Sequence, residues 1–518
     1  MQILHTDCLV IGAGLAGSAY ALHAARAGLR VELLSLGGPD AANSSQAQGG
    51  IIYDDDTHPE LLASDILAAS DGTSNPAAIA QLVNEGPRAV RELLLEEFHV
   101  PFDRDASGEL VKTREGGHSE KRIIFSKDAT GRAITTAVAK GVATAKGVTR
   151  HENWMAVDLL TLSHHSSEPA DRYEPLTCFG AYVLDTSTGE VLAIIARKTV
   201  LATGGLGQIF LHTTNQSGTV GQGMAMAYRV GARLIDLEYV QFHPTVFAKK
   251  NAPRFLVTEA LRGEGGVIVN AKGERFVDPI HPRGSLAPRD VVARAIRNEL
   301  AATGEPCAFL DLSAMKPGFA KERFPGVYAR CLEHGVDIAR ESIPIVPAAH
   351  YSCGGVHTDL DGRTNIRDLN AIGETAGTGL HGANRLASTS LLECLTGARA
   401  TAAADAVDLA AAAKRRPTPQ AWKSPTREAD PVLVRQDMLQ IQHTMWNYAG
   451  VVRSAERLSR ARRILIELRE EIQTFYRGCR LTRELVELRN AVQTALLVVH
   501  AASLNPVSKG CHYVEREG

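Results

Sequence analysis

Residues 380–395 combine one arginine with three hydroxyl side chains ahead of an apolar segment. Arg385 is followed by Ser388, Thr389 and Ser390, and the chain turns apolar at Leu391. This profile predicts a loop that runs into a buried helix. The N-terminus of such a helix directs backbone N–H groups and a partial positive charge outward. We therefore expect it to face an anion or the electron-rich edge of a cofactor.

A glycine-rich turn near the N-terminus predicts a second binding element. Gly12, Gly14 and Gly17 form a G-x-G-x-x-G pattern directly after the apolar run at 7–11, and an alanine-rich segment and a second apolar run follow. Glycines at this spacing allow a tight turn, close approach to a pyrophosphate and close helix–sheet packing. A turn without a ligand is the alternative, which the flanking strands disfavour. The acid expected at the end of the second strand is absent and Ser35 lies nearest to that end, so the pattern alone leaves the choice of dinucleotide open.

Composition and charge exclude several classes of protein. With 518 residues the chain is too long for one core, which predicts about two to four domains. A formal net charge of -2 and an aromatic content of 5% favour neither nucleic acid nor a membrane surface. No apolar run approaches the roughly 20 residues that span a bilayer, and the N-terminus lacks the pattern of a signal peptide. The eight cysteines form no C-x-x-C pair, so we expect scattered thiols in a reducing cytoplasm.

The texture of the chain changes twice. Polar groups alternate with apolar ones from about residue 238 to 350, which we interpret as an inserted second domain. A polar segment interrupted by prolines at 414–419 then predicts a linker. Beyond it, apolar residues at helical spacing predict three helices, near 432–448, 454–475 and 481–502, in a small bundle.

Two further motifs have simpler readings when taken alone. His243, within Q-F-H-P-T, would by itself be a satisfied core histidine. The D-x-D-G sequence at 359–362 matches part of a calcium loop, but the other ligands are missing. A hairpin turn is predicted there instead, and no metal site is expected.

Seven motifs nevertheless follow one another in a fixed order. They are G-x-G-x-x-G at 12–17, S-x-A-Q-G-G at 45–50, A-T-G-G at 202–205, Q-F-H-P-T at 241–245, T-E-A-L-R-G-E-G-G at 258–266, P-R-D-V-V at 288–292 and H-G-A-N-R-L-A-S-T-S-L-L-E at 381–393. Together they resemble the succinate dehydrogenase/fumarate reductase flavoprotein family over essentially the whole chain. The resemblance implies an α/β fold with a Rossmann-like FAD-binding domain at 1–237 and 351–413. It also implies an inserted α+β capping domain at 238–350 and a C-terminal helical domain at 414–518.

Three details favour the amino-acid-oxidising members of the family over the respiratory dehydrogenases. Asn43 stands where the respiratory proteins have a histidine that holds FAD covalently, so the flavin should be non-covalent. Arg385 is followed by L-A-S, where the dehydrogenases tend to have L-G. The loop at 114–119, R-E-G-G-H-S, resembles a substrate loop of the oxidases. Thr389 departs from the asparagine that is usual in these oxidases, and a local change near the flavin is expected.

The resemblance implies oxidation of L-aspartate to iminoaspartate, the entry to quinolinate and NAD, with the flavin reoxidised by O2 or fumarate. The first alternative is a fumarate reductase or succinate dehydrogenase subunit, which would carry covalent flavin and bind iron–sulfur partners. The second is a flavoprotein without catalytic activity. Pathway logic alone suggests functional coupling to a quinolinate synthase.

A dicarboxylate needs two anion sites, and the resemblance assigns them. Arg385 and His350 should hold one carboxylate, and His243 and the Thr258 hydroxyl the other, because a guanidinium fork matches a carboxylate. Gln241 and Glu115 are expected nearby, and Glu115 could recognise the substrate ammonium. The proposed catalytic residues are Arg289, Glu259 and Arg262. Free guanidinium is a poor base, so either a relay through Glu259 and Arg262 serves Arg289 or Arg289 only clamps the substrate.

The resemblance also assigns contacts to FAD. The glycine-rich turn should approach the pyrophosphate, Ser35 the adenosine ribose, Glu374 the ribityl hydroxyls, and Ser390 and Leu391 the pyrimidine ring. The full set is Gly12, Ala13, Gly14, Ala16, Gly17, Ser35, Ser44, Ser45, Gln48, Gly49, Gly50, Ala202, Thr203, Gly204, Glu374, Ser390 and Leu391.

Overall fold

A central seven-stranded sheet organises the first part of the chain. The computed structural model describes residues 1–38, 41–53, 58–411 and 417–515. The sheet contains β1 (Ile3–Ile11), β2 (Val31–Ser35), β6 (Val148–Glu152), β7 (Trp154–Thr161), β8 (Cys178–Asp185), β9 (Glu190–Leu201) and β16 (Leu369–Ala371). Its order is β6-β2-β1-β9-β8-β7, with β16 also paired to β9. β1 pairs in parallel with β2 and β9, β2 pairs in parallel with β6, and β9 pairs in parallel with β16. β8 runs antiparallel to β7 and β9.

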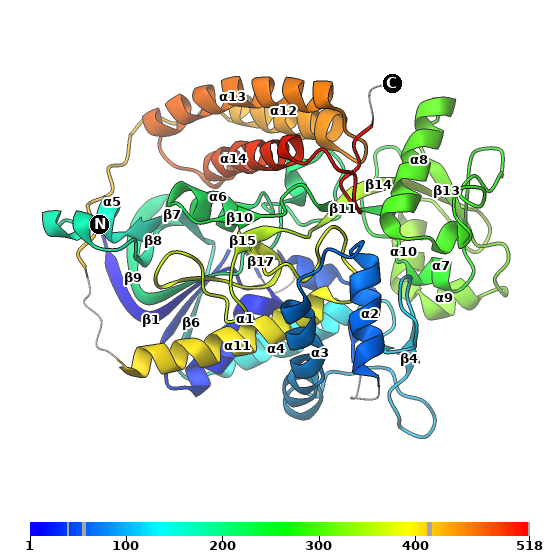
Figure 1. The fold of residues 1–518 in the computed structure, drawn as a ribbon, viewed down its shortest axis with the longest axis horizontal. Helices are drawn as coiled ribbons and strands as arrows, with labels where there is room; N and C mark the ends of the chain where they lie inside the picture. Colours follow the sequence, from blue (N-terminus) through cyan, green and yellow to red (C-terminus); the bar gives the residue numbers. More distant parts are fainter. Residues whose placement is uncertain (39–40, 54–57, 412–416, 516–518) are drawn as a thin grey trace.

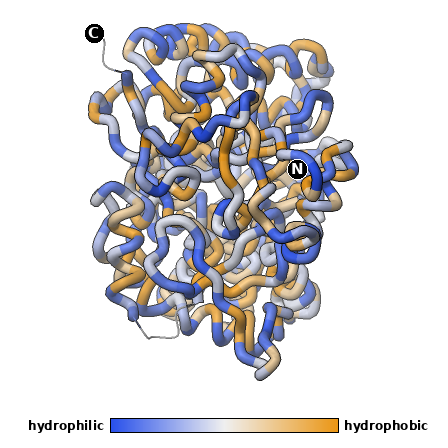
Figure 2. The backbone as a smooth tube through the Cα atoms, turned by 90° about the vertical axis from the view of Figure 1, so that its right-hand side faces the viewer, coloured by the Kyte–Doolittle hydropathy of each residue, from blue (hydrophilic) through white to orange (hydrophobic). Residues whose placement is uncertain are grey.

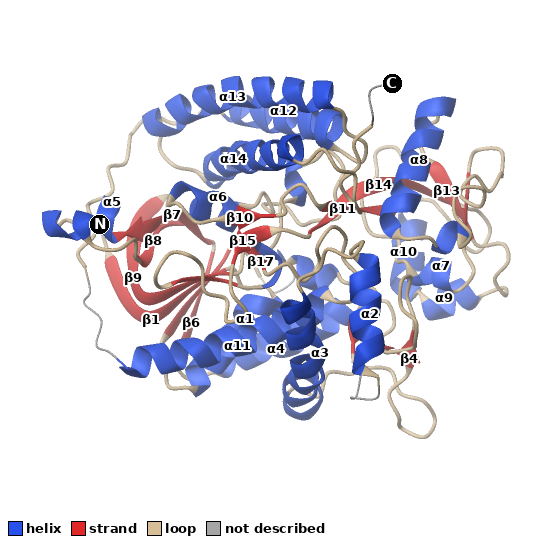
Figure 3. Ribbon diagram, viewed as in Figure 1, coloured by secondary structure: helices blue, strands red, loops and turns tan. Residues whose placement is uncertain are grey.

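Helices cover both faces of this sheet (Figure 3). In the view of Figure 1, α1 (Leu15–Arg26), α3 (Pro76–Val90), α4 (Thr130–Thr144) and α11 (Ser390–Ala411) lie below the strands. α3 continues as a π-helical segment over Arg91–Glu97, and α2 (Pro59–Ala69) packs beside it. The middle of β1 is fully buried at Cys8, Leu9 and Val10, as a parallel strand covered on both faces requires.

A separate antiparallel sheet lies at the right of Figure 1. Its strands are β11 (Val240–Phe247), β12 (Val267–Val269), β13 (Ala308–Asp311) and β14 (Ile343–Ser352), in the order β11-β14-β13-β12. The helices α7 (Ala260–Gly263), α8 (Arg289–Thr303), α9 (Phe319–Arg323) and α10 (Pro325–Glu333) belong to the same part of the chain. β14 runs without interruption across residue 350, so the end expected for the inserted domain falls within a strand.

Three helices form a layer above the main sheet in Figure 1. They are α12 (Pro431–Ala449), α13 (Ala455–Gly478) and α14 (Arg483–Leu504), each within a few residues of its prediction. The segment before these helices pairs with the rest of the protein, unlike the free linker that its sequence predicts. Residues 414–416 lie outside the described residues, but Thr418 O accepts from Ser167 N (2.9 Å) and Gln420 N donates to His165 O (2.8 Å). This segment is therefore docked on the loop that follows β7.

The remaining elements are short. They are β3 (Ile51–Ile52), β4 (Lys112–Thr113), β5 (Ile123–Ile124), α5 (Leu162–His165), α6 (Gln222–Arg229), β10 (Leu234–Ile235), β15 (Gly355–His357) and β17 (Ala376–Gly377). Figure 2 shows hydrophobic and hydrophilic segments alternating along the chain. Within the described residues, no helix combines the length and the apolar character needed to cross a membrane.

Candidate active site

A cavity of about 510 Å³ lies between the main sheet and the inserted domain. Residues at or just beyond the carboxyl ends of parallel strands line it, including Ile11, Ser35, Ala202 and Ile372. Ligands of open α/β sheets bind at this edge. The inserted domain contributes His243, Thr258, Glu259, Arg289 and His350, and the loop before α11 contributes Arg385, Ser388, Ser390 and Leu391.

Arg385 is held where the loop enters α11, which begins at Ser390 as predicted. Its Nη1 donates to Ser390 Oγ (3.2 Å), and its Nη2 donates to Gln241 Oε1 (3.2 Å). The guanidinium lies over the Tyr351 ring, 4.5 Å from the centroid, and Tyr351 OH donates to Glu393 (2.7 Å). Its Nε is buried without a hydrogen-bond partner, so the group retains capacity to bind an anion.

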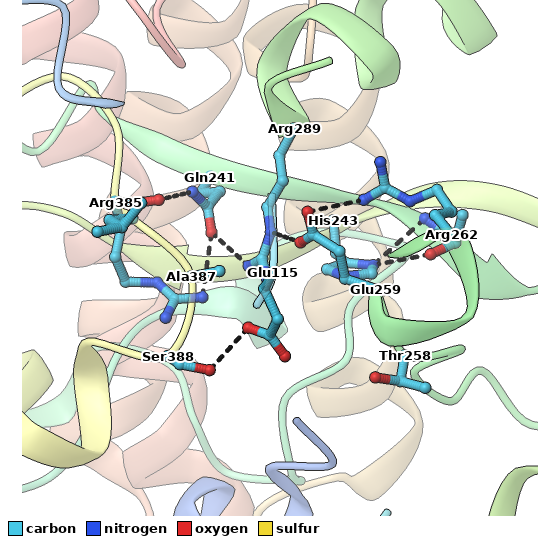
Figure 4. A network of polar contacts seen from close by, with 12 residues as sticks. Glu115, Gln241, His243, Thr258, Glu259, Arg262, Arg289, Arg385, Ala387 and Ser388 are labelled. Atoms are coloured by element: carbon cyan, nitrogen blue, oxygen red, sulfur yellow. Dashed lines mark hydrogen bonds and ion pairs between the residues drawn. The ribbon is translucent and has the colours of Figure 1, made fainter. Parts of the chain in front are cut away.

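Arg289, Glu259 and Arg262 form a contiguous chain of charges (Figure 4). Arg289 Nε donates to Glu259 Oε2 (2.6 Å), and Arg262 Nη2 lies 3.4 Å from Glu259 Oε1. Burial alone would raise the pKa of Glu259, but the charges of Arg289 and Arg262 outweigh burial and lower it. Glu259 therefore remains a carboxylate between two guanidinium groups, with Arg262 behind it rather than on the cavity wall.

Two neutral imidazoles lie beside each other, with ring centroids 5.1 Å apart. Burial, reinforced by Arg289, lowers the pKa of His243 well below its ordinary value, and burial with Arg385 does the same to His350. The Thr245 N–H donates to His243 Nδ1 (3.3 Å). A neutral ring that accepts at Nδ1 carries its proton on Nε2, so His243 can donate a hydrogen bond to a carboxylate. His350 Nδ1 contacts Thr214 Oγ1 at 2.7 Å.

Glu115 places a carboxylate in the same cavity. In the view of Figure 4 it lies between Arg385 on one side and Thr258 on the other. Ser388 Oγ donates to Glu115 Oε2 (2.7 Å), and Ser388 takes a left-handed φ of 60° to do so. Burial, and then the charge of Glu259, raises the pKa of Glu115. The guanidinium groups of Arg289 and Arg385 thus line the cavity together with two carboxylates, which favours an anionic ligand that also has a cationic group.

Comparison with known proteins bears on the identity of this ligand. Residues 7–391 match the family model described as an FAD binding domain, and residues 438–516 match one described as fumarate reductase flavoprotein C-term. L-aspartate oxidase 1 of Ralstonia nicotianae is 45% identical over an alignment of 518 positions, and the alignment covers 98% of this chain and 95% of that protein. The chain belongs to the L-aspartate oxidase family.

Other relatives agree with this assignment. The L-aspartate oxidase of Pseudomonas aeruginosa is 42% identical over 521 residues, covering 98% of this chain and 94% of that protein. Among solved structures, a variant of Escherichia coli quinol fumarate reductase superposes with a TM-score of 0.87 at 26% identity, covering 100% of this chain and 92% of that one. The L-aspartate oxidase family thus shares its fold with the fumarate reductase flavoproteins.

The other half of the cavity fits FAD. Gly12 has φ +112° and no room for a side chain, because a Cβ would lie 2.2 Å from Ala202 O. Its backbone can therefore approach a pyrophosphate closely. Gln48 Oε1 lines the cavity and is buried without a partner, as expected for a group that awaits a ligand. Predicted cofactor contacts on the cavity wall are Gly12, Ala13, Gly14, Ala16, Ser35, Ser44, Gln48, Gly49, Gly50, Ala202, Thr203, Gly204, Glu374, Ser390 and Leu391.

Two predicted cofactor contacts, Gly17 and Ser45, lie off the cavity wall, as does Thr389. Gly17 packs α1 against the turn, since a Cβ there would lie 1.9 Å from Gly12 O. Ser45 is off the cavity wall, and its hydroxyl donates to Ala42 O (2.8 Å). Thr389 Oγ1 donates to Leu386 O (2.7 Å), so this residue fixes the turn before α11 and does not line the cavity.

Sequence reasoning missed partners that only the fold reveals. Thr214, Ser388 and Tyr351 orient His350, Glu115 and Arg385, respectively. Gln241 lies off the cavity wall and joins the two arginines, because its Oε1 also accepts from Arg289 Nη1 (2.9 Å). The only sequence signal for these roles was proximity to a motif residue, as for Tyr351 beside His350.

Glu374→Gln should make the stability of the apoprotein less dependent on pH. Burial raises the pKa of Glu374 to about 7, and Ser352 N–H donates to its Oε1 (3.0 Å). An unfolded glutamate titrates near pH 4.3, so wild-type unfolding free energy falls as pH rises from about 5 through about 7. Glutamine accepts the same N–H and does not titrate. Relative to wild type, the variant should gain up to about 3 kcal/mol between about pH 5 and about pH 8. Urea unfolding of both apoproteins at several pH values measures this gain. A difference in unfolding free energy that does not change with pH would contradict the raised pKa of Glu374.

Proposed function

We propose that the protein oxidises L-aspartate to iminoaspartate, with O2 or fumarate as the final electron acceptor. The observation that supports this most directly is Glu115, a buried carboxylate that shares one cavity with the guanidinium groups of Arg289 and Arg385. Those groups suit a dicarboxylate, and Glu115 suits an ammonium, which succinate lacks. The names of the relatives point to the same substrate.

Binding of the two substrate carboxylates uses groups on different elements. Arg385, with His350 beside it, would hold one carboxylate. His243, through Nε2–H, and the Thr258 hydroxyl would hold the other. The cavity buries these groups, so each charge-assisted hydrogen bond is worth more than it would be in water.

Proton transfer is assigned to Arg289. FAD, when bound, supplies the acceptor for the two electrons. Arg289 reaches the cavity, and Glu259 and Arg262 extend behind it as a continuous path for a proton. A guanidinium holds its proton strongly, so the relay requires Arg289 to pass a proton to the contacting Glu259 carboxylate in the same step in which it takes one from the substrate. The alternative role, a substrate clamp without proton transfer, uses the same contacts.

A respiratory dehydrogenase subunit is the second candidate, and Asn43 counts against it. Asn43 lines the cavity and its Oδ1 accepts from Gln216 N (2.8 Å). An amide is no nucleophile toward a flavin, so FAD should be held without a covalent bond. Acid precipitation of the holoprotein should therefore leave the yellow colour in the supernatant. Colour that stays with the precipitate would contradict this prediction.

Product analysis tests the proposed function. With L-aspartate in air the holoenzyme should form hydrogen peroxide, oxaloacetate and ammonia in equal amounts, because iminoaspartate hydrolyses to the last two. Formation of fumarate from succinate, with no reaction of L-aspartate, would favour the respiratory alternative.

The pathway and the cellular location of the reaction are part of the same proposal. Iminoaspartate is a hydrolysable imine, which supports delivery to a quinolinate synthase in the route to NAD. All eight cysteines are free, which supports a reducing cytoplasmic location. The C-terminal helical domain is the proposed contact for the synthase, so an active enzyme that lacks this domain should support a lower pathway flux. Equal flux would weaken this assignment.

A further inference from the structure

The segment after α14 returns to the substrate site. Residues 505–515 run down from the helical layer beside α8 and β11 (Figure 1). The segment is anchored at Arg453, which is fully buried and donates through Nη1 to Glu238 O (2.7 Å) and contacts His512 Nδ1 (2.6 Å). Backbone bonds from Arg453 N to Tyr513 O (3.0 Å) and from Glu515 N to Arg453 O (2.8 Å) complete this anchor. The segment is thus a built part of the fold.

Cys511 connects the segment to the arginine loop. Its backbone N–H donates to Ala383 O (2.9 Å), and its thiol donates to Asn384 Oδ1 (3.1 Å). Burial raises the pKa of the Cys511 thiol well above its ordinary value, so the proton that makes this hydrogen bond is retained. Asn384 directly precedes Arg385.

A second path reaches the same asparagine from α8. Arg294 Nη1 donates to Gly510 O (3.0 Å), and its guanidinium lies 5.1 Å from the Tyr513 ring centroid. Arg294 Nη2 also pairs with Asp290 Oδ2 (2.9 Å), and Asn384 Nδ2 donates to Asp290 Oδ1 (3.3 Å). Both paths therefore orient the Asn384 amide, with its oxygen toward Cys511.

Asn384 in turn orients Gln241. Gln241 Nε2 donates to Asn384 Oδ1 (2.7 Å) and to Arg385 O (2.9 Å). This leaves Oε1 facing Arg289 Nη1 and Arg385 Nη2. The reversed amide would point an NH2 group at two guanidinium donors, which is unfavourable. A neutral oxygen holds both arginines without neutralising them, so their charges remain available for an anion.

We propose that residues 505–515 are a positioning element of the substrate site, acting through Cys511, Asn384 and Gln241 on Arg289 and Arg385. Asn384 and Cys511 are positioning residues that touch neither substrate nor FAD. This inference rests on the proposed function, because it assigns the two arginines to the dicarboxylate. It gives the C-terminal segment a role in substrate binding that is separate from the helical bundle.

Rapid mixing of holoenzyme variants with L-aspartate without oxygen tests the proposal. The dependence of flavin reduction on L-aspartate concentration gives an apparent dissociation constant and a limiting rate. Cys511→Ala should raise the dissociation constant roughly three- to tenfold, and Asn384→Ala tenfold or more, as expected for loss of one or several buried hydrogen bonds. Cys511→Ser, which keeps a donor, should stay within about twofold of wild type. Cys479→Ala, which removes a buried thiol at the end of α13, is the matched control and should also stay within about twofold.

The pattern across variants separates positioning from loss of structure. Adding Cys511→Ala to Asn384→Ala should have almost no further effect, because both act along one path. The thermal shift that succinate gives each holoenzyme provides a second measure of dicarboxylate binding and should fall in the same order. Wild-type binding constants and succinate shifts for both Cys511→Ala and Asn384→Ala would overturn the inference, as would equal effects of Cys511→Ser and Cys511→Ala. A wild-type holoenzyme that L-aspartate fails to reduce would instead count against the proposed function, and the succinate shifts would still decide the inference.

Discussion

Arg385→Leu should abolish turnover of L-aspartate and leave FAD bound. Arg385 is buried, lies over Tyr351 and keeps one guanidinium nitrogen free of protein partners. Removing a charge-assisted contact to a carboxylate costs about 2–5 kcal/mol, so loss of this contact alone should lower kcat/KM by about 30- to 4,000-fold. Steady-state kinetics of the holoenzyme gives kcat/KM, and the flavin absorbance gives the fraction of the protein that holds FAD.

Arg399→Leu provides a matched control for this variant. Arg399 lies on the same helix, α11, and its pair with Glu85 (2.6 Å) is at the surface. Surface ion pairs contribute little, so near wild-type activity is expected. Near-normal activity of Arg385→Leu itself would refute its assigned role in substrate binding.

Glu115→Gln should change which dicarboxylate the protein prefers. The variant keeps the shape of the side chain and can still accept from Ser388, but it removes the charge that we propose faces the substrate ammonium. A hydrogen bond between charged groups contributes about 1.5–3 kcal/mol, so L-aspartate should bind about 10- to 100-fold more weakly. Succinate should bind equally well or better, because the substitution removes the charge of one of the two carboxylate side chains, Glu115 and Glu259, that repel a dianion in the cavity.

The ratio of the two dissociation constants is the measurement, since it cancels general damage to the site. Glu120→Gln is the control, because Glu120 belongs to the same loop region, its side chain is 40% exposed, and it lies 3.9 Å from Arg122. Equal weakening of both ligands by Glu115→Gln would show that Glu115 supports the cavity without reading the ammonium.

Local patterns in the sequence were enough for the elements that frame the site. The apolar run of β1, the glycines after it and the helix at Ser390 all follow from neighbouring residues, and each lies where it was expected. Contacts between residues that are far apart in the sequence could not be predicted. Cys511 and Asn384 are 127 positions apart, and Gln241 and Arg385 are 144 apart, so no periodicity connects them.

Position relative to the cavity was the other limit of the sequence. Ser45 and Gly17 share motifs with residues of the cavity wall, yet neither lines the cavity. The Ser45 hydroxyl bonds to Ala42 O within a 3-10 turn, and Gly17 packs α1 against the turn at Gly12. Residues 417–420 have the composition of a free linker, and backbone pairing with 165–167 overrides it.

Anaerobic mixing of the holoenzyme with L-aspartate or with succinate tests most directly whether the cavity recognises an amino dicarboxylate. The yellow flavin absorbance should bleach with L-aspartate and persist with succinate, because only L-aspartate offers an ammonium to Glu115. Bleaching by succinate together with an unchanged spectrum in L-aspartate would contradict recognition of an amino dicarboxylate and favour a fumarate reductase or succinate dehydrogenase activity.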